Sequence, residues 1–225
     1  MVDYEEFVKL SLEYVNDGKT DVEKTFCEYI ENNKDNATAY KIALKGVKRN
    51  LKSDIAFFVE SDPAVDSEEE IKIAYPGFLA VSYYRIAHEI RKLGYLLPSR
   101  IISEIAHSET GIDIHPSAVI DSPFFIDHGT GIVIGETTVI GKRVKLYQGV
   151  TLGALSLSGG YKLKGVKRHP TIGNDVTIYS GASVLGDVKI GNNVTIGSNV
   201  FLSENIPPNT KVTIAKPILV FKQKN

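Results

Sequence analysis

Histidines and aspartates in turn-forming segments are the residues of this 225-residue chain best suited to acid–base chemistry. His128 directly follows Asp127, and His115 lies two positions after Asp113. A third histidine, His169, ends an irregular, basic stretch. Histidine has an ordinary pKa close to neutrality, so it can accept and release a proton at physiological pH, and a nearby carboxylate can fix its tautomer. The pattern predicts proton transfer, although an Asp–His pair at a turn is also compatible with a capped corner.

The first 110 residues carry helical signals. Apolar residues recur at helical spacing, and the Asn-rich segment ENNKDN interrupts them. Asp66, followed three positions later by Glu69, predicts a helix start, Pro76 suits the first turn of the next helix, and Gly94 suits its end. We therefore expect a helical domain over residues 1–110.

From Gly111 onward the sequence repeats every six residues. Such a unit suits a short strand and a turn on one side of a triangular prism, so three units give an 18-residue coil with aliphatic side chains stacked inside. The usual rule for parallel crossovers favours a right-handed coil. We predict an α+β protein whose helical domain precedes a parallel β-helix of about four coils over residues 111–217, with a tail over 218–225. The repeated positions are Ile114, Ile120 and Ile126, then, after a slip of two residues, Ile134, Ile140, Leu146 and Leu152, and finally Ile172, Ile178, Val184, Ile190, Ile196 and Leu202.

Spacing relates these coils to the candidate site. Asp113 and His128 are 15 positions apart, three short of one coil, which places them on neighbouring coils near the same edge. Residues 154–169 interrupt the repeat with three glycines and five basic residues, His169 included. A plain surface loop is the simplest interpretation. Because the segment leaves a rigid prism, we predict an arm that covers a cleft between adjacent subunits.

Specific motifs accompany the repeat, and with them the sequence resembles the left-handed parallel β-helix acyltransferases and, among these, the serine acetyltransferases, over about residues 56–217. The resemblance implies a left-handed coil in place of the usual hand. The motifs are DPAVD (62–66), YYRIAHEI (83–90), GIDIHPSAVI (111–120), IDHGTGIVIGET (126–137), TLG (151–153) and KRHPTIG (167–173).

This resemblance implies transfer of acetyl from acetyl-CoA to the hydroxyl of L-serine, the first step of cysteine biosynthesis, without a tightly bound cofactor or metal. His128 would be the general base and Asp113 would hold its ring. No serine or cysteine nucleophile is placed for an acyl-enzyme, so we expect direct transfer in a ternary complex. The implied serine-binding residues are Asp62, Asp127, Glu136, Arg168 and His169, and CoA is expected in an outer groove at Gly153, Ala154, Ser180, Gly181 and Ser198, with Lys189, Lys211 or Lys216 near its phosphates.

The resemblance also concerns partners. It implies a homotrimer, or a dimer of trimers, although the helical part is shorter than in the longer members. Cysteine is the expected feedback inhibitor because it resembles serine. The sequence stops at FKQKN, without the isoleucine-ending tail by which some members bind O-acetylserine sulfhydrylase, so we do not assume that partnership.

The composition of the chain argues against nucleic acids and membranes as binding partners. The chain has 26 Lys and Arg against 27 Asp and Glu, so no basic excess favours nucleic acid or an anionic membrane surface. One cysteine excludes an internal disulfide. The acidic start MVDYEEFVKL and the lack of a long apolar run predict a cytoplasmic protein.

Three other interpretations stay open. The prism and its histidine would also suit acetylation of a different hydroxyl acceptor. His115, His128 and His169 could instead bind zinc between subunits, as in a metalloenzyme built on the same prism. A non-catalytic scaffold is the third, although it would not need Asp113, Asp127, His128, Arg168 and His169 together. The remaining histidines, His88 and His107, lie in the helical half and are expected to be structural or solvent-facing.

Overall fold

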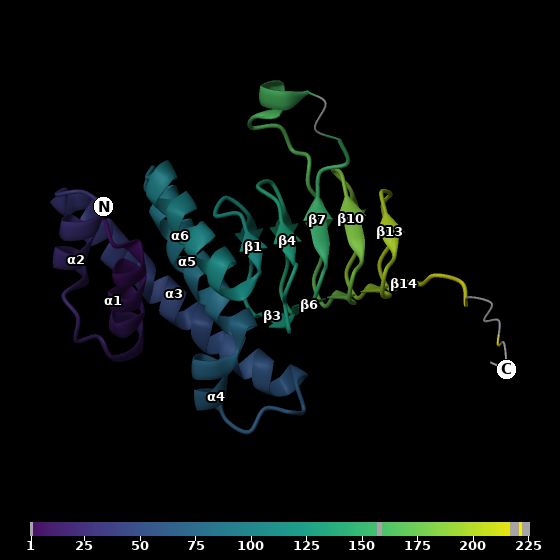
Figure 1. The fold of residues 1–225 in the computed structure, drawn as a ribbon, viewed down its shortest axis with the longest axis horizontal. Coiled ribbons are helices and arrows are strands. Elements are labelled where there is room, and N and C mark those ends of the chain that lie inside the picture. Colours follow the sequence, from purple (N-terminus) through teal and green to yellow (C-terminus); the bar gives the residue numbers. More distant parts are fainter. Residues whose placement is uncertain (1, 157–158, 217–220, 222–225) are drawn as a thin grey trace, which may run out of the picture.

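The computed structural model describes residues 2–156, 159–216 and 221. Six helices precede a parallel β-solenoid, as the periodicities predicted, and the third, fifth and sixth of them contact the strands of its first turn (Figure 1). The helices are α1 (Tyr4–Asp17), α2 (Val22–Tyr29), α3 (Lys34–Ser61), α4 (Glu68–Ala74), α5 (Pro76–Lys92) and α6 (Leu96–Thr110).

Polar side chains begin several of these helices. Asp3 and Asn33 accept hydrogen bonds from the first-turn N–H groups of α1 and α3. The start of α4 lies one residue later than predicted. Ser67, rather than Asp66, is the N-cap and accepts from Glu70 N at 3.1 Å, while the Glu70 carboxylate accepts from Asp66 N at 2.8 Å. The reciprocal capping pattern is present, with its register shifted by one.

A buried ion pair joins the helical domain to the solenoid. Arg85 on α5 donates to both carboxylate oxygens of Asp54 on α3, at 2.7 and 2.9 Å, and the two side chains are 4% and 0% exposed. Asp54 Oδ1 also accepts from Phe124 N and Ser122 Oγ, each at 2.9 Å. A buried carboxylate is costly unless its oxygens are hydrogen-bonded, so this set of partners determines how α3 and α5 meet the first turn.

Close backbone approach completes this junction. A Cβ at Gly77 of α5 would lie 2.3 Å from the carbonyl oxygen of Ile126, so only glycine lets the helix reach the strand there. Tyr84 Oη donates to Ala118 O at 2.7 Å and accepts from Ile120 N at 3.1 Å. The helices thus cover the end of the solenoid, which would otherwise expose unpaired strands.

Three parallel sheets form the sides of the solenoid, and their inner faces carry the repeated aliphatic residues. Sheet A contains β1 (Asp113–Ile114), β4 (Val133–Ile134), β7 (Thr151–Gly153), β10 (Ser183–Leu185) and β13 (Phe201–Leu202). Sheet B contains β2 (Val119–Ile120), β5 (Val139–Ile140), β8 (Thr171–Ile172) and β11 (Lys189–Ile190). Sheet C contains β3 (Phe124–Asp127), β6 (Val144–Tyr147), β9 (Thr177–Ile178), β12 (Thr195–Ile196) and β14 (Lys211–Val212).

The solenoid has about five turns, one more than the hexads predicted, since sheets A and C each hold five strands. The chain runs from sheet A to B to C in each turn, and we call the corners between them the A–B, B–C and C–A edges. In the regular part Thr171 pairs with Lys189, 18 positions on. The predicted tail, residues 218–225, lies outside the described residues except for Phe221.

Two insertions break the 18-residue period. The first insertion is seen by comparing two successive turns. Six positions separate Asp127 from Val133, whereas four separate their partners on the next turn, Tyr147 and Thr151. The extra two residues therefore lie in the C–A corner between β3 and β4.

The second insertion lies at the A–B edge. Val139 pairs with Thr171, 32 positions on, so 14 extra residues separate β7 from β8. This arm carries the short helix η1 (Gly160–Leu163) and projects beyond the sheets (Figure 1).

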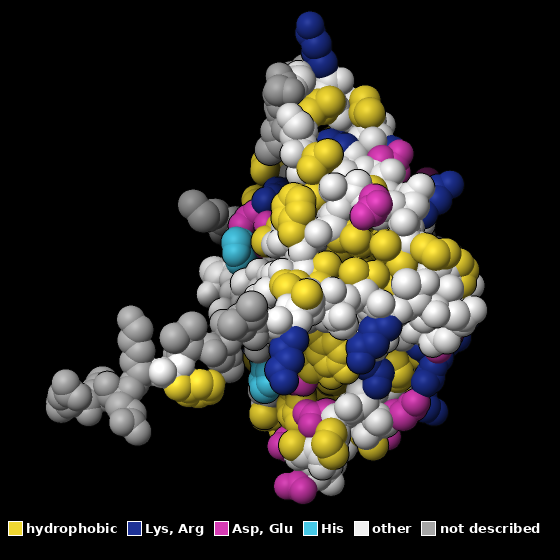
Figure 2. Space-filling model, turned by 90° about the vertical axis from the view of Figure 1, so that its right-hand side faces the viewer, with side chains coloured by type: hydrophobic (Ala, Val, Ile, Leu, Met, Phe, Trp, Pro, Cys, Tyr) yellow, Lys and Arg dark blue, Asp and Glu magenta, His cyan; other side chains and the backbone are white. Residues whose placement is uncertain are grey.

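Charge is mixed on the face of the molecule at the C-terminal end of the solenoid. Figure 2, which faces the C-terminal end of the solenoid, shows basic and acidic side chains interspersed, in keeping with the formal net charge of −1. Among the helices of the described residues, none combines the length and apolarity that a membrane crossing requires.

Candidate active site

The candidate base, His128, lies in the corner that contains the two-residue insertion. Its backbone adopts a left-handed conformation, with φ 56°, which few residues other than glycine adopt. The side chain is 71% exposed, and its Nε2 lies 3.7 Å from Asp127 Oδ1. The insertion therefore presents the imidazole outside the prism, beside a carboxylate.

Asp62 and Asp127 form the acidic part of the same edge. Asp62 ends α3, and its oxygens accept from Ala64 N at 2.8 Å and from Tyr75 Oη at 2.9 Å. Burial, followed by the Asp62 bond, raises the pKa of Tyr75 to about 12, and the Asp127 charge acts in the same direction. Burial also raises the pKa of Tyr147, with smaller effects of Asp127 and Asp62. Both carboxylates therefore lie near both phenols.

We call Asp62, Tyr75, Asp127 and His128 the acidic cluster. Sequence reasoning missed Tyr75. The available signal was its position immediately before Pro76, at the N-cap of α5, where its ring is fixed close to the end of α3.

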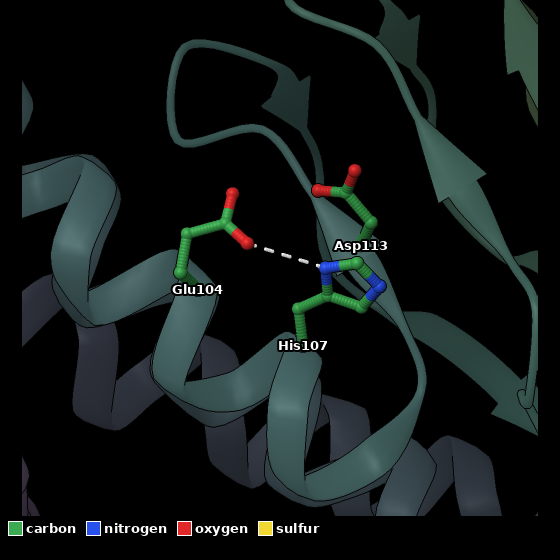
Figure 3. A group of neighbouring side chains, drawn as sticks. All are labelled: Glu104, His107 and Asp113. Atoms are coloured by element: carbon green, nitrogen blue, oxygen red, sulfur yellow. Dashed lines mark hydrogen bonds and ion pairs between the residues drawn. The ribbon is translucent and has the colours of Figure 1, made fainter.

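Asp113, the predicted orienting residue, lies on β1 next to this corner, and its N–H donates to Ile132 O at 2.9 Å. Its side chain points to α6 instead. One carboxylate oxygen and ligand atoms of Glu104 and His107 lie within 4.8 Å of one another (Figure 3). Among the described residues, no hydrogen bond joins Asp113 to His128.

His169 lies at the A–B edge and is 6% exposed. Its Nδ1 accepts from Thr137 N at 3.1 Å and lies 2.8 Å from Thr137 Oγ1. Because Nδ1 is an acceptor, the proton of the neutral ring lies on Nε2. Burial, then the charges of Arg168 and Lys167, lower the pKa of His169 to about 4. The ring packs so closely on Gly135 that a Cβ there would lie 2.2 Å from Nε2.

Arg168 and Glu136 form an ion pair beside this ring, with Arg168 Nη2 2.5 Å from Glu136 Oε2. The Arg168 bond lowers the pKa of Glu136. Arg168 Nη1 donates to Leu163 O at 3.1 Å. His115 lies between β1 and β2, at the same edge, and burial lowers its pKa to about 4 against the opposing charge of Glu136.

Thr137 anchors the arm, and sequence reasoning missed it. Its Oγ1 accepts from Arg168 N at 3.0 Å and from His169 N at 3.1 Å. Lys167 Nζ donates to Thr137 O at 2.7 Å. The only local signal was its place at the end of the IVIGET string. We call Glu136, Thr137, Arg168 and His169 the arginine cluster.

The two clusters lie at opposite ends of sheet A within one chain. The acidic cluster occupies the C–A edge and the arginine cluster the A–B edge, with β4 between them. The three histidines considered as zinc ligands are divided in the same way. His115 and His169 share the A–B edge, and His128 lies at the other.

The residues expected to bind CoA border the same sheet. Gly153 and Ala154 lie at the A–B end of β7, whereas Ser180, Gly181 and Ser198 lie in C–A corners. The hydroxyl of Ser180 donates to Ser198 Oγ at 3.2 Å. Lys189, Lys211 and Lys216 are exposed, on β11, on β14 and after β14.

The solenoid, the arm and the two clusters at its edges are together typical of the hexapeptide-repeat transferases. The family described as "Bacterial transferase hexapeptide (six repeats)" matches residues 169–204.

Comparison with individual relatives identifies the family within this class. The Helicobacter pylori protein named serine acetyltransferase is 48% identical over 128 residues, which are 57% of this chain and 71% of the relative. A Synechococcus elongatus plasmid serine acetyltransferase is 53% identical over 151 residues, or 66% of this chain. The match spans only 47% of that relative's length. The chain belongs to the serine acetyltransferase family.

Solved structures agree with this assignment. Entamoeba histolytica serine acetyltransferase isoform 3, in complex with cysteine, superposes with a TM-score of 0.83 and 35% identity, covering 99% of this chain and 85% of that one. The Neisseria gonorrhoeae enzyme in complex with serine gives a TM-score of 0.75 and 28% identity over 94% of this chain and 82% of that one.

Proposed function

We propose that this protein is a serine O-acetyltransferase, which converts acetyl-CoA and L-serine to O-acetyl-L-serine and CoA as the first step of cysteine biosynthesis. One observation carries the proposal beyond family membership. The solenoid bears the acidic cluster, with its exposed histidine, on one edge and the arginine cluster on another. An amino acid carries both charges, and its hydroxyl needs a base.

The clusters suit the two ends of serine. Asp62 and Asp127 attract the ammonium group and disfavour acceptors that lack one. Arg168 binds the carboxylate, with Glu136 holding the guanidinium in place, and the Nε2–H of His169 is a second donor.

His128 removes the proton of the serine hydroxyl as the oxygen attacks the thioester carbonyl. The new C–O bond gives a tetrahedral intermediate, the C–S bond then breaks, and the departing sulfur takes the proton from His128. Asp113 stabilises the imidazolium after a rotation of its carboxylate away from α6. No acyl-enzyme forms, so both substrates are bound together.

A complete site requires a second subunit in this proposal. Because the two clusters lie across the width of sheet A, the C–A edge of one prism must meet the A–B edge of the next. A homotrimer of parallel prisms satisfies this for all three sites, and a dimer of trimers would preserve it. The arm, residues 154–169, then covers each cleft.

Acetyl-CoA is a co-substrate rather than a tightly bound cofactor in this proposal. Its pantetheine lies in the groove beside sheet A, where Gly153, Ala154, Ser180, Gly181 and Ser198 offer backbone groups and small side chains. Exposed lysines, Lys216 among them, attract its phosphates.

Regulation and location follow from the same assignment. Cysteine competes for the serine site, and the cysteine complex of the Entamoeba histolytica isoform 3 enzyme supports this. We place the enzyme in the cytoplasm, as the sequence predicted. Binding to O-acetylserine sulfhydrylase is not part of the proposal.

Release of CoA tests the proposed function. Initial rates are compared for L-serine, homoserine and a thiogalactoside, with and without cysteine. We expect a clear preference for serine and competitive inhibition by cysteine. Equal rates on the three acceptors would exclude a serine-specific enzyme.

A variant tests the base. His128→Ala should lower kcat by about two to four orders of magnitude, the usual contribution of a general base. The exposed side chain contributes little to packing, so thermal unfolding should not change. Substantial residual activity would refute the assignment.

A further inference from the structure

A second site lies beside the proposed catalytic one. We propose that Glu104, His107 and Asp113 bind a divalent transition-metal ion of the zinc class, and that the ion withholds Asp113 from acetyl transfer. The inhibitory part rests on the proposed function, whereas the binding part does not. Figure 3 shows the three side chains converging from α6 and β1.

The donor atoms lie close to the spacing that one ion requires. Zn²⁺ binds histidine nitrogen and carboxylate oxygen at about 2.0–2.1 Å in a tetrahedron, which sets neighbouring ligand atoms about 3.3 Å apart. His107 Nδ1 lies 3.3 Å from Glu104 Oε2, and one ligand atom from each of the three residues lies within 4.8 Å of the other two. Binding of one ion would draw the Asp113 carboxylate closer to the other two ligands.

The backbone holds these ligands in place. Glu104 and His107 stand one helical turn apart, the Glu-x-x-His arrangement that metal-binding helices use. The helix ends immediately beyond them, where Gly111 N donates to His107 O at 2.9 Å in a left-handed C-cap. The Thr110 hydroxyl then accepts from Ile112 N at 3.2 Å. This short turn delivers Asp113 beside His107.

The chemistry of the set favours a transition metal over calcium or magnesium. Imidazole nitrogen suits zinc and its neighbours in the first row, whereas Ca²⁺ and Mg²⁺ prefer oxygen ligands. Two carboxylates neutralise the charge of the ion. Arg100 pairs with Glu104 Oε1 and thereby leaves Oε2 to face His107.

Both helical ligands are partly exposed, at 46% for Glu104 and 45% for His107, so water has access to the remaining coordination position.

The consequence for catalysis comes from Asp113, because one carboxylate cannot bind the ion and orient His128 at the same time. Metal occupancy selects the α6-facing position, which is the position that the structure shows. Removing His107 should therefore free Asp113 without touching serine or acetyl-CoA.

Direct binding is the first test. Full-length protein freed of metal by chelation is titrated with Zn²⁺ against a chromophoric chelator, and with Co²⁺ while its visible absorption is recorded. We expect one ion per chain, with affinity lowered at least tenfold in Glu104→Gln and His107→Ala. Glu109→Gln, on the same helix but outside the triad, should bind as the unaltered chain does. Equal binding by all four proteins, or no binding at micromolar Zn²⁺, would overturn the site.

Activity is the second test. Zn²⁺ should inhibit acetyl transfer by the unaltered protein and by Glu109→Gln, and His107→Ala should keep its rate at the same concentration. Equal inhibition of His107→Ala would refute the coupling through Asp113. If the metal-free protein transferred no acetyl to serine, the proposed function would fail while the binding result still decided the site.

Discussion

Thr137→Val isolates the anchor of the arm. The substitution keeps the shape of the side chain but removes the oxygen that accepts from Arg168 N and His169 N. An unpaired buried N–H costs about 1–3 kcal/mol. Because Arg168 is only partly buried, its N–H costs less than that of His169, and we expect the closed arm to lose about 2–3 kcal/mol of stability in total. When the arm opens, water can accept from both N–H groups, so the open arm does not bear this cost. The population of the open arm should therefore rise roughly 30- to 150-fold.

Limited trypsin digestion measures this population, since the arm contains several lysines and cleavage follows the open fraction when closing is fast. Cleavage within residues 154–169 should accelerate by about the same factor, and the apparent KM for serine should rise. The hydrogen bonds of Thr137 do not involve the helical domain, so the free energy of unfolding of that domain should not change.

The neighbouring threonine supplies the control. Thr138 is 0% exposed, and its Oγ1 has no hydrogen-bond partner among the described residues. Replacing an unsatisfied hydroxyl by a methyl group removes a cost, so Thr138→Val should leave the arm closed and be neutral or slightly stabilising. If the two valine variants were digested at the same rate, the anchoring role of Thr137 would be disproved.

Three further outcomes are expected. Tyr75→Phe removes the bond to Asp62 and should raise the KM for serine about tenfold, as loss of a charged hydrogen bond does, with a smaller change in kcat; an unchanged KM would contradict the assignment. Arg85→Ala leaves the buried Asp54 without its ion-pair partner and should lower the free energy of unfolding, measured in urea, by about 3–5 kcal/mol. A loss below about 1 kcal/mol would contradict a stabilising role for the pair. His169, with its pKa lowered from 6.5 to about 4, gives stability that is complete above pH 6.5 and is lost as pH falls toward 4, up to about 3 kcal/mol. His169→Gln should weaken the dependence of unfolding free energy on pH, and an unchanged dependence would exclude His169 as its cause.

Deviations from the repeat proved more informative than the repeat itself. The two-residue slip before Ile134 marks the corner that presents His128, and the interruption after Gly153 marks the arm with Arg168 and His169. A regular coil must keep its corners short to stack, so a functional side chain that stands outside the prism needs extra backbone. The sequence therefore located both clusters along the chain.

The sequence alone determined the helical half, the solenoid, the family and the types of charge at the site, because periodicity and motifs are local properties. The tertiary structure decided which residues meet. It placed His128 and Arg168 on opposite edges, paired Arg85 with Asp54, and turned Asp113 toward His107. Such contacts join segments far apart in sequence or depend on a side-chain rotation, and no local pattern encodes either. A six-residue period fixes which side chains enter the core, whereas the path of each insertion fixes where the chemistry occurs.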